Sequence, residues 1–410
     1  MDTGHRFAEC GHETSVVTTA VKEKPALDRR SSSVIAVNTD TRYVTPERAG
    51  AAVRRAVESL RATTVYKKVD STLRGNVEAE IIAALDAADA ELVFFAPAFP
   101  LAGRATVEGI HQVNGDPVTE TEYGDDPNAP PTAALTACFD NYDGPVSHLD
   151  ADTIDGGPKQ VSSALDSIIA AHDEAPIVCC DAATDTALAT IASAGEKYNG
   201  IYAGSGGLAA HVSVPVSPTA PTEMPTPNPG APLAVVGSAS SMTFTQLARL
   251  PAECIHKLDA TEIVSDGWAP DLTTAVQRLS KGKPTVLTAA TNDEDVQTAL
   301  AAGRRHGQSP ASVRNRIASR LAAATRTILE TTRPSGLALT GGDIAGATLR
   351  TLDATMINLA GAAVGTGIPI GVIRDGDAAG LSIVTKPGGF GHSETLCECL
   401  DALTPVGFDK

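Results

Sequence analysis

The feature that most limits how this chain can fold is a proline-rich stretch near its middle. Seven prolines lie between residues 215 and 232. Proline fixes one backbone dihedral angle and lacks an amide hydrogen, so such a stretch stays extended and semi-rigid. On both sides of it, short apolar strand patterns alternate with helical patterns, which is typical of α/β proteins. We therefore expect two α/β domains, residues 1–212 and 233–410, joined by a linker at 213–232.

Each domain is expected to contain a largely parallel sheet flanked by helices. A chain of 410 residues is long for a single hydrophobic core, which also favours two domains. Ligands of open α/β sheets bind beyond the carboxyl ends of the strands. We expect the active site to lie in the cleft between the two domains.

Polar groups are most concentrated in residues 66–76, with the sequence YKKVDSTLRGN. β-Branched residues before them predict a buried strand, and apolar spacing from Glu78 onward predicts a helix. The residues between form a strand-to-helix loop, where Arg74 offers a planar fork for a carboxylate or a phosphate. The alternative is that Asp70 or Ser71 caps the helix and Arg74 makes a surface ion pair.

A second polar segment follows the strand pattern at 92–95. Its prolines fix the path of a loop that leads to Arg104 and His111. Arg104 is a candidate clamp for a carboxylate, with a structural ion pair as the alternative. His111 is either a packed histidine or a substrate contact.

Three glycine turns in the second domain each follow a strand pattern directly. They are GSAS (237–240), TGGD (340–343) and KPGGFG (386–391). The P-loop signature GxxxxGK[ST] does not occur in the sequence. Backbone N–H groups of several such turns can instead converge on phosphate groups, although each turn alone could be an ordinary glycine turn. Asp343 is a candidate ligand for Mg²⁺ or a helix cap.

Five segments together resemble the four-carbon acid sugar kinase family, ATP-dependent enzymes that phosphorylate threonate, erythronate or 3-oxo-tetronate. The segments are YKKVDSTLRGN (66–76), FAPAFPLAGRATVEGIHQVNGDPVTET (95–121), VVGSASSMTFTQ (235–246), LALTGGDIAGATL (337–349) and GLSIVTKPGGFG (380–391). They occur in the family's order and span nearly the whole chain. That combination is far more specific than any single glycine-rich string.

The resemblance implies transfer of the γ-phosphoryl group of ATP, with Mg²⁺, to a hydroxyl of a four-carbon sugar acid, the terminal C4 hydroxyl. It implies catalytic roles for Asp70, near the accepting hydroxyl, and for Arg74. Residues implied for the sugar acid are Lys68, Ser71, Asn76, Arg104 and His111. Residues implied for ATP are Ser238, Ser240, Thr340, Gly341, Gly342, Asp343, Lys386, Gly388 and Gly389, with Asp343 as the metal ligand.

Two places depart from the family pattern. Members usually begin with a strand and an acidic loop that reads like D-D-x-T-G-A, whereas only Asp2, Thr3 and Gly4 stand here. We expect an N-terminal truncation: either the start is misplaced or part of the active site is missing, and the catalytic base is Asp70 or a carboxylate of that loop. Ile344 replaces a hydroxyl residue after the paired glycines, so any contact from that hydroxyl is lost.

The charge and cysteine content limit the partners. A net charge of −17 with a pI near 4.9 argues against nucleic acid, and an anionic sugar acid needs local cations such as Lys67, Lys68, Arg74 and Arg104. Lysine is scarce, with 11 lysines against 21 arginines. This composition is typical of a salt-adapted cytoplasmic protein, the alternative being an acidic mesophile. The seven cysteines lack the spacing of a disulfide framework or a zinc site.

Other functions compete with that of a kinase. The stretch AGSGGLA (203–209) imitates a dinucleotide fingerprint and would support an NAD-dependent dehydrogenase, but no acidic strand end follows it. A non-catalytic sugar-acid-binding protein would explain the first domain alone. Residues 354–373 carry no charge, but their glycines and proline favour a buried segment over a membrane span. We expect small-molecule partners, without nucleic acid or membrane, and leave a homodimer open.

Overall fold

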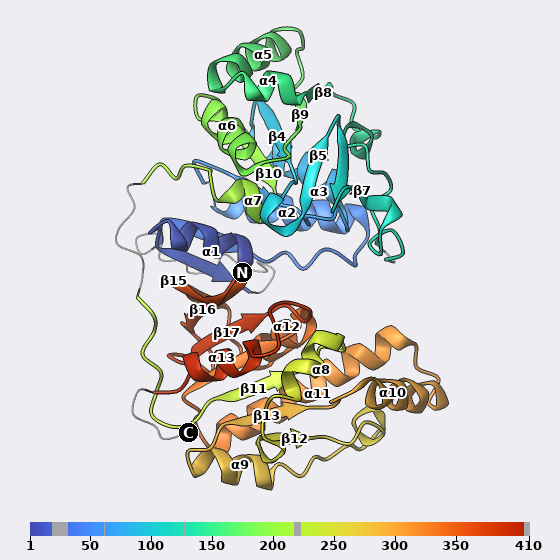
Figure 1. Ribbon diagram of the computed structural model, residues 1–410, viewed down its shortest axis with the longest axis vertical. Coiled ribbons are helices and arrows are strands. Elements are labelled where there is room, and N and C mark those ends of the chain that lie inside the picture. Colours follow the sequence, from blue (N-terminus) through green and yellow to red (C-terminus); the bar gives the residue numbers. More distant parts are fainter. Residues whose placement is uncertain (19–31, 61, 127, 217–222, 406–410) are drawn as a thin grey trace. The chain divides into compact units, whose positions relative to one another are not determined.

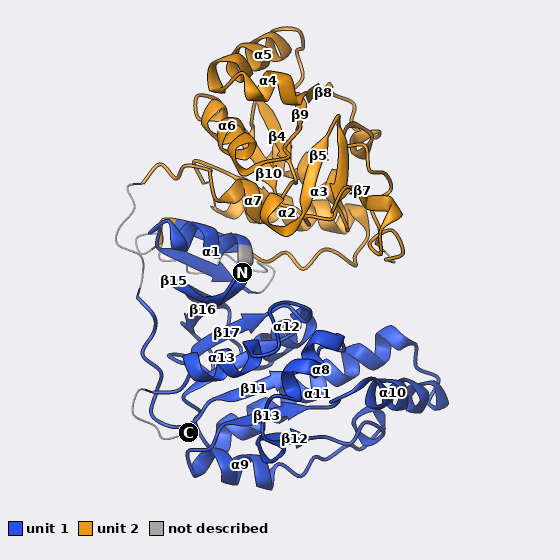
Figure 2. Ribbon diagram, viewed as in Figure 1, with its two compact units in different colours: residues 1–18, 34–36, 218–410 blue, residues 19–33, 37–217 orange. Residues whose placement is uncertain are grey.

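The computed structural model describes residues 1–18, 32–60, 62–126, 128–216 and 223–405. Part of the predicted linker, 217–222, and the last five residues of the predicted second domain lie outside this description. The linker residues 213–216 and 223–232 contain no helix or strand, as predicted. The chain forms two compact units (Figure 2): unit 1 contains residues 1–18, 34–36 and 218–410, and unit 2 contains residues 19–33 and 37–217.

Unit 2 is built on a parallel five-stranded sheet in the order β3-β10-β4-β9-β8 (Figure 1). Buried residues of α2 and α3 pack on one face, with Phe95 in the sheet. On the other face Phe94 stacks on Tyr202, with ring centroids 5.2 Å apart. The elements are α2 (Pro46–Leu60), β3 (Tyr66–Lys68), α3 (Val77–Ala88), β4 (Leu92–Ala96), β8 (Val146–Leu149), α4 (Ala151–Asp155), α5 (Pro158–Ala170), β9 (Ile177–Cys180), α6 (Asp185–Gly195), β10 (Gly200–Gly204) and α7 (Gly206–Ala209).

A small antiparallel sheet lies beside the carboxyl ends of these strands. It contains β5 (Arg104–Val107), β6 (Ile110–Val113) and β7 (Asp116–Pro117). Thr106 forms an isolated bridge with Ala182, just beyond β9. The sequence patterns did not predict this hairpin, and it carries Arg104 and His111. Short 3₁₀ turns border it at η1 (Pro100–Ala102), η2 (Val118–Glu120) and η3 (Thr136–Phe139).

Unit 1 contains a mixed nine-stranded sheet in the order β12-β13-β11-β14-β17-β16-β15-β1-β2. The first five strands are parallel, and the pairs β17–β16, β16–β15 and β15–β1 are antiparallel. The prediction of a largely parallel sheet therefore holds for one half of it. The elements are β11 (Leu233–Val236), α8 (Ser241–Leu247), η4 (Ala252–Cys254), β12 (Ile255–Lys257), η5 (Glu262–Val264), α9 (Thr273–Ser280), β13 (Thr285–Thr288), α10 (Asp293–Arg305), α11 (Pro310–Thr331), β14 (Gly336–Thr340), α12 (Gly342–Thr351), β15 (Met356–Gly365), β16 (Ile368–Ile373), β17 (Ser382–Lys386) and α13 (Thr395–Ala402).

Two hydrophobic clusters cover the two faces of this sheet. Leu233 and Val235 pack with residues of α9 to α12, whereas Ala234 and Val236 pack with residues of α8 and α13. The alternation follows from the two-residue period of a strand. The uncharged residues 354–373 form the β15–β16 hairpin, and no helix in the described part of the chain is long and apolar enough to cross a membrane.

The N-terminal residues were predicted to belong to the first domain, 1–212, but residues 1–18 and 34–36 belong to unit 1. Strands β1 (Thr14–Val17) and β2 (Val34–Val37) extend the sheet of unit 1, and helix α1 (Asp2–Glu9) packs against β1 and β15. Strand β1 is buried along its whole length and pairs with β15, Ser15 opposite Asn358. Because Val16 and Ala8 share the hydrophobic cluster of Leu359, this segment belongs to the core of unit 1.

Candidate substrate and nucleotide sites

The loop between β3 and α3 has a constrained backbone. The amide of Leu73 donates to the Asp70 carbonyl at 2.9 Å, and Leu73 is buried with a left-handed φ of 58°. This conformation is costly for a branched side chain, and such strain tends to occur where function requires a fixed geometry. Gly75, with φ 94°, donates to the carbonyl of Asn128 at 3.1 Å. The loop backbone is therefore fixed by one hydrogen bond within the loop and by one to the segment that contains Asn128.

Asp70 lies at the centre of an ion cluster in this loop. Its Oδ2 accepts from Nε of Arg74 at 2.7 Å and from Nη2 of Arg42 at 3.2 Å, and Nη1 of Arg74 lies 3.3 Å from Asp126. Burial tends to raise the pKa of Asp70, but the charges of Arg74, Lys68 and Arg42 outweigh burial and lower it. Asp70 is thus a carboxylate at neutral pH.

The alternative interpretation of the loop holds only in that Arg74 forms ion pairs. Arg74 forms ion pairs, but its side chain is only 22% exposed, so the pairs are not surface pairs of the ordinary weak kind. Neither Asp70 nor Ser71 caps α3, because the N-cap is Asn76 and no side chain caps that end.

The other predicted substrate residues of this loop have different surroundings. Lys68 is exposed, whereas Lys67 is bound to Glu80, with Nζ and Oε2 2.6 Å apart. The amide of Asn76 donates to the carbonyls of Thr41 and Val44, at 2.9 and 3.0 Å. Asn76 therefore fastens the preceding polar loop and has both amide hydrogens occupied.

Arg104 carries no ion pair among the described residues. Its guanidinium donates to the Ala102 carbonyl and, at 3.1 Å, to the hydroxyl of Tyr123. Its Nε is buried and lacks a hydrogen-bond partner in the described part of the chain. A buried donor of this kind is costly unless something else accepts from it. The geometry favours the predicted carboxylate clamp over the structural ion pair.

His111 differs from its predicted role as a substrate contact. It is completely buried, its Nδ1 lies 3.0 Å from the hydroxyl of Thr106, and its Nε2 lies 2.9 Å from the Ser71 carbonyl. Burial lowers its pKa, so the ring is neutral and Nε2 is the donor to Ser71. With both nitrogens bonded, His111 has no free group for a ligand and instead fixes the loop to the β5–β6 hairpin.

Three residues of this site were not among the predicted site residues. Arg42 lies in a polar loop after a strand pattern, and that placement was the available signal. Tyr123 and Asp126 lie in the polar loop before residue 132. The sequence contains no signal for them, and their contacts with Arg74 in the structure identify them as part of the site. Together, four cationic side chains lie around two carboxylates: Arg42, Lys68, Arg74 and Arg104 around Asp70 and Asp126. This positive surplus suits an anionic ligand.

In unit 1 the three glycine turns come together. They follow β11, β14 and β17, which are neighbouring parallel strands, so all three lie at one edge of the sheet. Gly237 donates to the Thr340 carbonyl at 3.2 Å, and Gly341 donates to the Lys386 carbonyl at 2.9 Å. A Cβ on Gly388 would come within 2.2 Å of Oγ of Ser238. The turns are packed tightly against one another.

The predicted nucleotide residues at this edge divide into two groups. Gly342 and Asp343 are exposed, and a Cβ on Gly342 would meet nothing within 4 Å. Ser238 accepts from the amide of Ser240 at 3.2 Å and so orders its own turn, while Ser240 makes no side-chain cap. No group of three or more metal-ligating side chains occurs in the described residues, so Asp343 belongs to no preformed metal cluster there. One carboxylate with bound phosphates is a common way of holding Mg²⁺.

Lys386 faces into the protein. Its ammonium donates to the carbonyls of Pro387, Gly388 and Phe390, at 3.1, 2.8 and 3.2 Å, and the residue is 3% exposed. Burial lowers its pKa to about 8. This inward direction differs from the predicted direct contact with ATP. Lys386 instead turns the carbonyls of the glycine loop inward.

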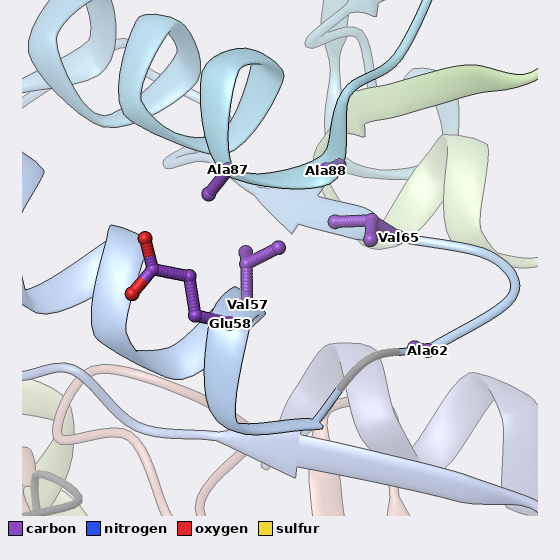
Figure 3. A pocket seen from close by; sticks show the side chains of 6 residues that line it. All are labelled: Val57, Glu58, Ala62, Val65, Ala87 and Ala88. Atoms are coloured by element: carbon purple, nitrogen blue, oxygen red, sulfur yellow. The ribbon is translucent and has the colours of Figure 1, made fainter.

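Two other features do not form the site. A hollow of about 500 Å³ is lined by Val57, Val65, Ala62, Ala87, Ala88 and Glu58 (Figure 3) and includes none of the predicted site residues. The fingerprint glycines, Gly204 and Gly206, are buried, and a Cβ on Gly204 would lie 2.7 Å from the Ala96 carbonyl. These glycines serve close packing within unit 2 and leave no space for a pyrophosphate.

Comparison with known families finds two matches. A model described as a sugar-binding N-terminal domain matches residues 1–212, and one described as a nucleotide-binding C-terminal domain matches residues 233–396. A crystal structure of a Haemophilus influenzae protein has a TM-score of 0.77 over 98% of this chain and 96% of that one. Its sequence is 18% identical, so this likeness concerns the fold alone.

Three relatives of known activity are similar along almost their whole length. The D-threonate kinase of Salmonella typhimurium is 33% identical, over 97% of this chain and 94% of the relative. The D-threonate kinase of Bordetella bronchiseptica is 33% identical, over 100% and 96%. The D-erythronate kinase of Heliobacterium modesticaldum is 30% identical, over 98% and 94%.

Proposed function

The chain belongs to the four-carbon acid sugar kinase family, and from that premise we propose that it transfers the γ-phosphoryl group of ATP to a hydroxyl of threonate or erythronate. The observation that carries the proposal is the convergence of the three glycine turns at the ends of β11, β14 and β17. Backbone amides grouped in this way bind phosphates without a P-loop.

Unit 2 supplies what the acceptor needs. The carboxylate of a sugar acid fits the two guanidiniums of Arg74 and Arg104, because a planar fork binds a carboxylate with two hydrogen bonds. The hydroxyl that accepts the phosphoryl group, which we propose to be the terminal C4 hydroxyl, then lies toward Asp70. Phosphoryl transfer depends mostly on positioning and charge neutralisation, so a weakly basic carboxylate suffices to orient this hydroxyl.

Mg²⁺ would supply charge neutralisation on the phosphates, and Asp343 is the residue that would hold it. The proposal includes Mg²⁺ because Asp343 is exposed beside the open position of Gly342. Salt adaptation and a cytoplasmic location are part of the same proposal, supported by the acidic composition and by seven free cysteines. The location of the reaction between the two domains stays a prediction.

The competing functions have less support. A dehydrogenase would need the fingerprint glycines, Gly204 and Gly206, to approach a dinucleotide, and they are buried. A non-catalytic sugar-acid-binding protein leaves the glycine turns of unit 1 without a role.

The test is incubation with ATP, Mg²⁺ and a panel of D- and L-threonate, D- and L-erythronate and 3-oxo-tetronates, with measurement of ADP. We expect ADP release that depends on one of these acids, and a phosphorylated product whose position is read by ³¹P–¹H NMR coupling. Binding of a tetronate with no ADP release at saturating ATP would support the binding protein and contradict the kinase. Phosphorylation at a carbon other than C4 would correct the regiochemistry only.

A further inference from the structure

One tyrosine connects the two arginines of the substrate cluster. The guanidinium carbon of Arg74 lies 5.2 Å from the ring centroid of Tyr123, and that of Arg104 lies 5.7 Å from the same centroid. The hydroxyl of Tyr123 also accepts from Nη2 of Arg104 at 3.1 Å. Each distance is within the range in which an aromatic ring attracts a cation.

The two arginines depend on this ring to different degrees. Arg74 is also held by Asp70 and Asp126. Arg104 has only two hydrogen-bonded groups in the described part of the chain, the Ala102 carbonyl and the Tyr123 hydroxyl. Two like charges near one ring repel each other, so something must offset that repulsion. Among the hydrogen bonds, ion pairs and ring contacts of the described residues, only those of Tyr123 involve both guanidiniums.

Tyr123 itself is fixed in place. Its ring packs against the hydrophobic core of unit 2, beside the face that contains Phe95. Its amide donates to Oγ1 of Thr121 at 3.4 Å, and the next residue, Gly124, donates to the Thr121 carbonyl at 2.9 Å. A Cβ on Gly124 would lie 2.2 Å from the Thr119 carbonyl. The turn that carries the tyrosine therefore has little freedom.

We propose that Tyr123 is a positioning residue whose ring and hydroxyl hold Arg74 and Arg104 in one fixed arrangement that binds the carboxylate of the acceptor. This inference rests on the proposed function and extends it from the two arginines to the residue that orients them. Binding is strengthened because the arginine side chains are already ordered before the ligand arrives. Tyr123 itself makes no contact with the reacting atoms in this proposal.

Variants of two tyrosines separate positioning from packing. Tyr123→Leu removes both ring contacts, and Tyr123→Phe keeps the ring and removes the bond to Arg104. Tyr142→Leu is the matched control, because Tyr142 packs against the same core and donates its hydroxyl to the Ala175 carbonyl at 2.5 Å. We expect Tyr123→Leu to raise KM for the preferred tetronate about tenfold, equivalent to about 1.4 kcal/mol, with little change in kcat or in the Kd for ATP. Tyr123→Phe should raise KM about threefold, and Tyr142→Leu should leave it unchanged.

A second measurement does not depend on turnover. In protein labelled with ¹⁵N-arginine, the Nε–H resonances of Arg74 and Arg104 are assigned with Arg74→Lys and Arg104→Lys. We expect both to carry a ring-current shift that Tyr123→Phe retains and Tyr123→Leu abolishes. Tyr123→Met serves if the leucine variant does not fold.

The outcomes distinguish the two proposals. A wild-type protein without tetronate-dependent ADP release contradicts the proposed function, and the arginine resonances then still decide whether Tyr123 orders the pair. An active wild type whose KM is unchanged in Tyr123→Leu overturns the inference. Equal increases in KM for Tyr123→Leu and Tyr142→Leu would assign the effect to packing and would overturn it as well.

Discussion

Asp70 shows why the surroundings of a residue decide its role more than its type does. Its pKa is lowered because Arg74, Lys68 and Arg42 outweigh the effect of burial. A general base works best with a pKa near the working pH, so Asp70 is a weak base. We therefore assign it to holding Arg74 and orienting the acceptor hydroxyl, roles that require the ionised form.

The first prediction concerns Arg74. Arg74→Ala should lower kcat/KM for the tetronate at least 100-fold, equivalent to about 3 kcal/mol, because the guanidinium that we assign to the acceptor carboxylate is lost. Arg74→Lys should not restore activity, because an ammonium lacks the fork. The Kd for ATP, measured by calorimetry, should stay within about twofold of wild type, since Arg74 lies in unit 2.

Arg54→Ala is the control for this prediction. Arg54 pairs with Asp86 in the same unit, and both side chains are well exposed, at 44% and 51%. Loss of an exposed pair costs at most about 1 kcal/mol and should leave the kinetics unchanged. A similar loss of ATP affinity in Arg74→Ala would show that the two units do not divide the substrates as proposed.

Lys386 gives a prediction about pH. Its folded pKa, lowered by burial from 10.5 to about 8, lies below its unfolded value. The charged form therefore costs stability below about pH 8, and that cost disappears as the pH rises toward 10.5. Cys399 is the titratable group whose charge would act on Lys386. Burial raises the pKa of Cys399 to about 12, so its thiol stays neutral between about pH 8 and 10.5.

Affinity for ATP should change in the opposite direction to stability. Above about pH 8 Lys386 loses its proton, so the carbonyls that it holds inward lose their charged donor. We therefore expect the Kd for ATP to increase between about pH 7.5 and about pH 9.5, the range on either side of this pKa. Lys386→Met at pH 7.5 should bind ATP as weakly as wild type does at pH 9.5. Its Tm should not fall, since Thr243 and Gln246 still donate to Gly388 and Phe390. A Kd for ATP independent of pH in wild type would contradict the proposed role.

Helices and strands of the chain were predicted well where the local pattern is strong. The pattern at 46–60 predicts α2 with its observed limits, and that at 233–236 does the same for β11. The strand predicted from the β-branched residues beside YKKVDSTLRGN is short, since β3 contains only Tyr66–Lys68. The convergence of the three glycine turns follows from the order of the strands, which the sequence does not reveal, although the turns themselves were found.

Two elements could not be predicted from local patterns. The β5–β6 hairpin consists of two strands of four residues, and its apolar alternation is too short to recognise. Strand β1 pairs with β15, which is more than 300 residues away in sequence, and no local pattern contains such a pairing. The hairpin explains why His111 is packed and not the predicted substrate contact. The pairing of β1 with β15 explains why the N-terminal residues belong to unit 1 and not to the predicted first domain, 1–212.

The next prediction concerns the N-terminal turn of α12. Gly342→Val should raise the Kd for ATP at least tenfold, because its side chain would occupy the open space that we assign to the phosphates. Gly346→Val on the same helix is the matched control, since its Cβ would meet only the flexible end of Arg350. Both positions lie in α12, so each substitution replaces a helical glycine by valine. Equal effects of the two on ATP binding, measured by calorimetry, would place the phosphates elsewhere.

At the scale of the whole molecule, net charge opposes both folding and substrate binding. With a charge of −17, carboxylates repel one another across the surface and repel an anionic sugar acid. The described ion pairs around Asp70 create a local positive surplus that offsets this field at one place. Screening by salt acts most on exposed charges and least on such partly buried pairs.

The last prediction follows from this difference. Raising KCl from about 0.05 to 1 M shortens the screening length from roughly 14 Å to about 3 Å, so repulsion between surface carboxylates should fall. We expect the Tm, followed by circular dichroism at pH 7.5, to rise by about 2 °C or more, the shift that follows from roughly 2 kcal/mol in a protein of this size. The same addition of salt near pH 4.9, where the net charge is close to zero, should give a much smaller gain. Because the Arg74–Asp70 pair is shielded from solvent, activity should persist in 1 M KCl. A Tm that falls with salt at pH 7.5, or a gain of equal size at the two pH values, would show that carboxylate repulsion does not limit the stability of this protein.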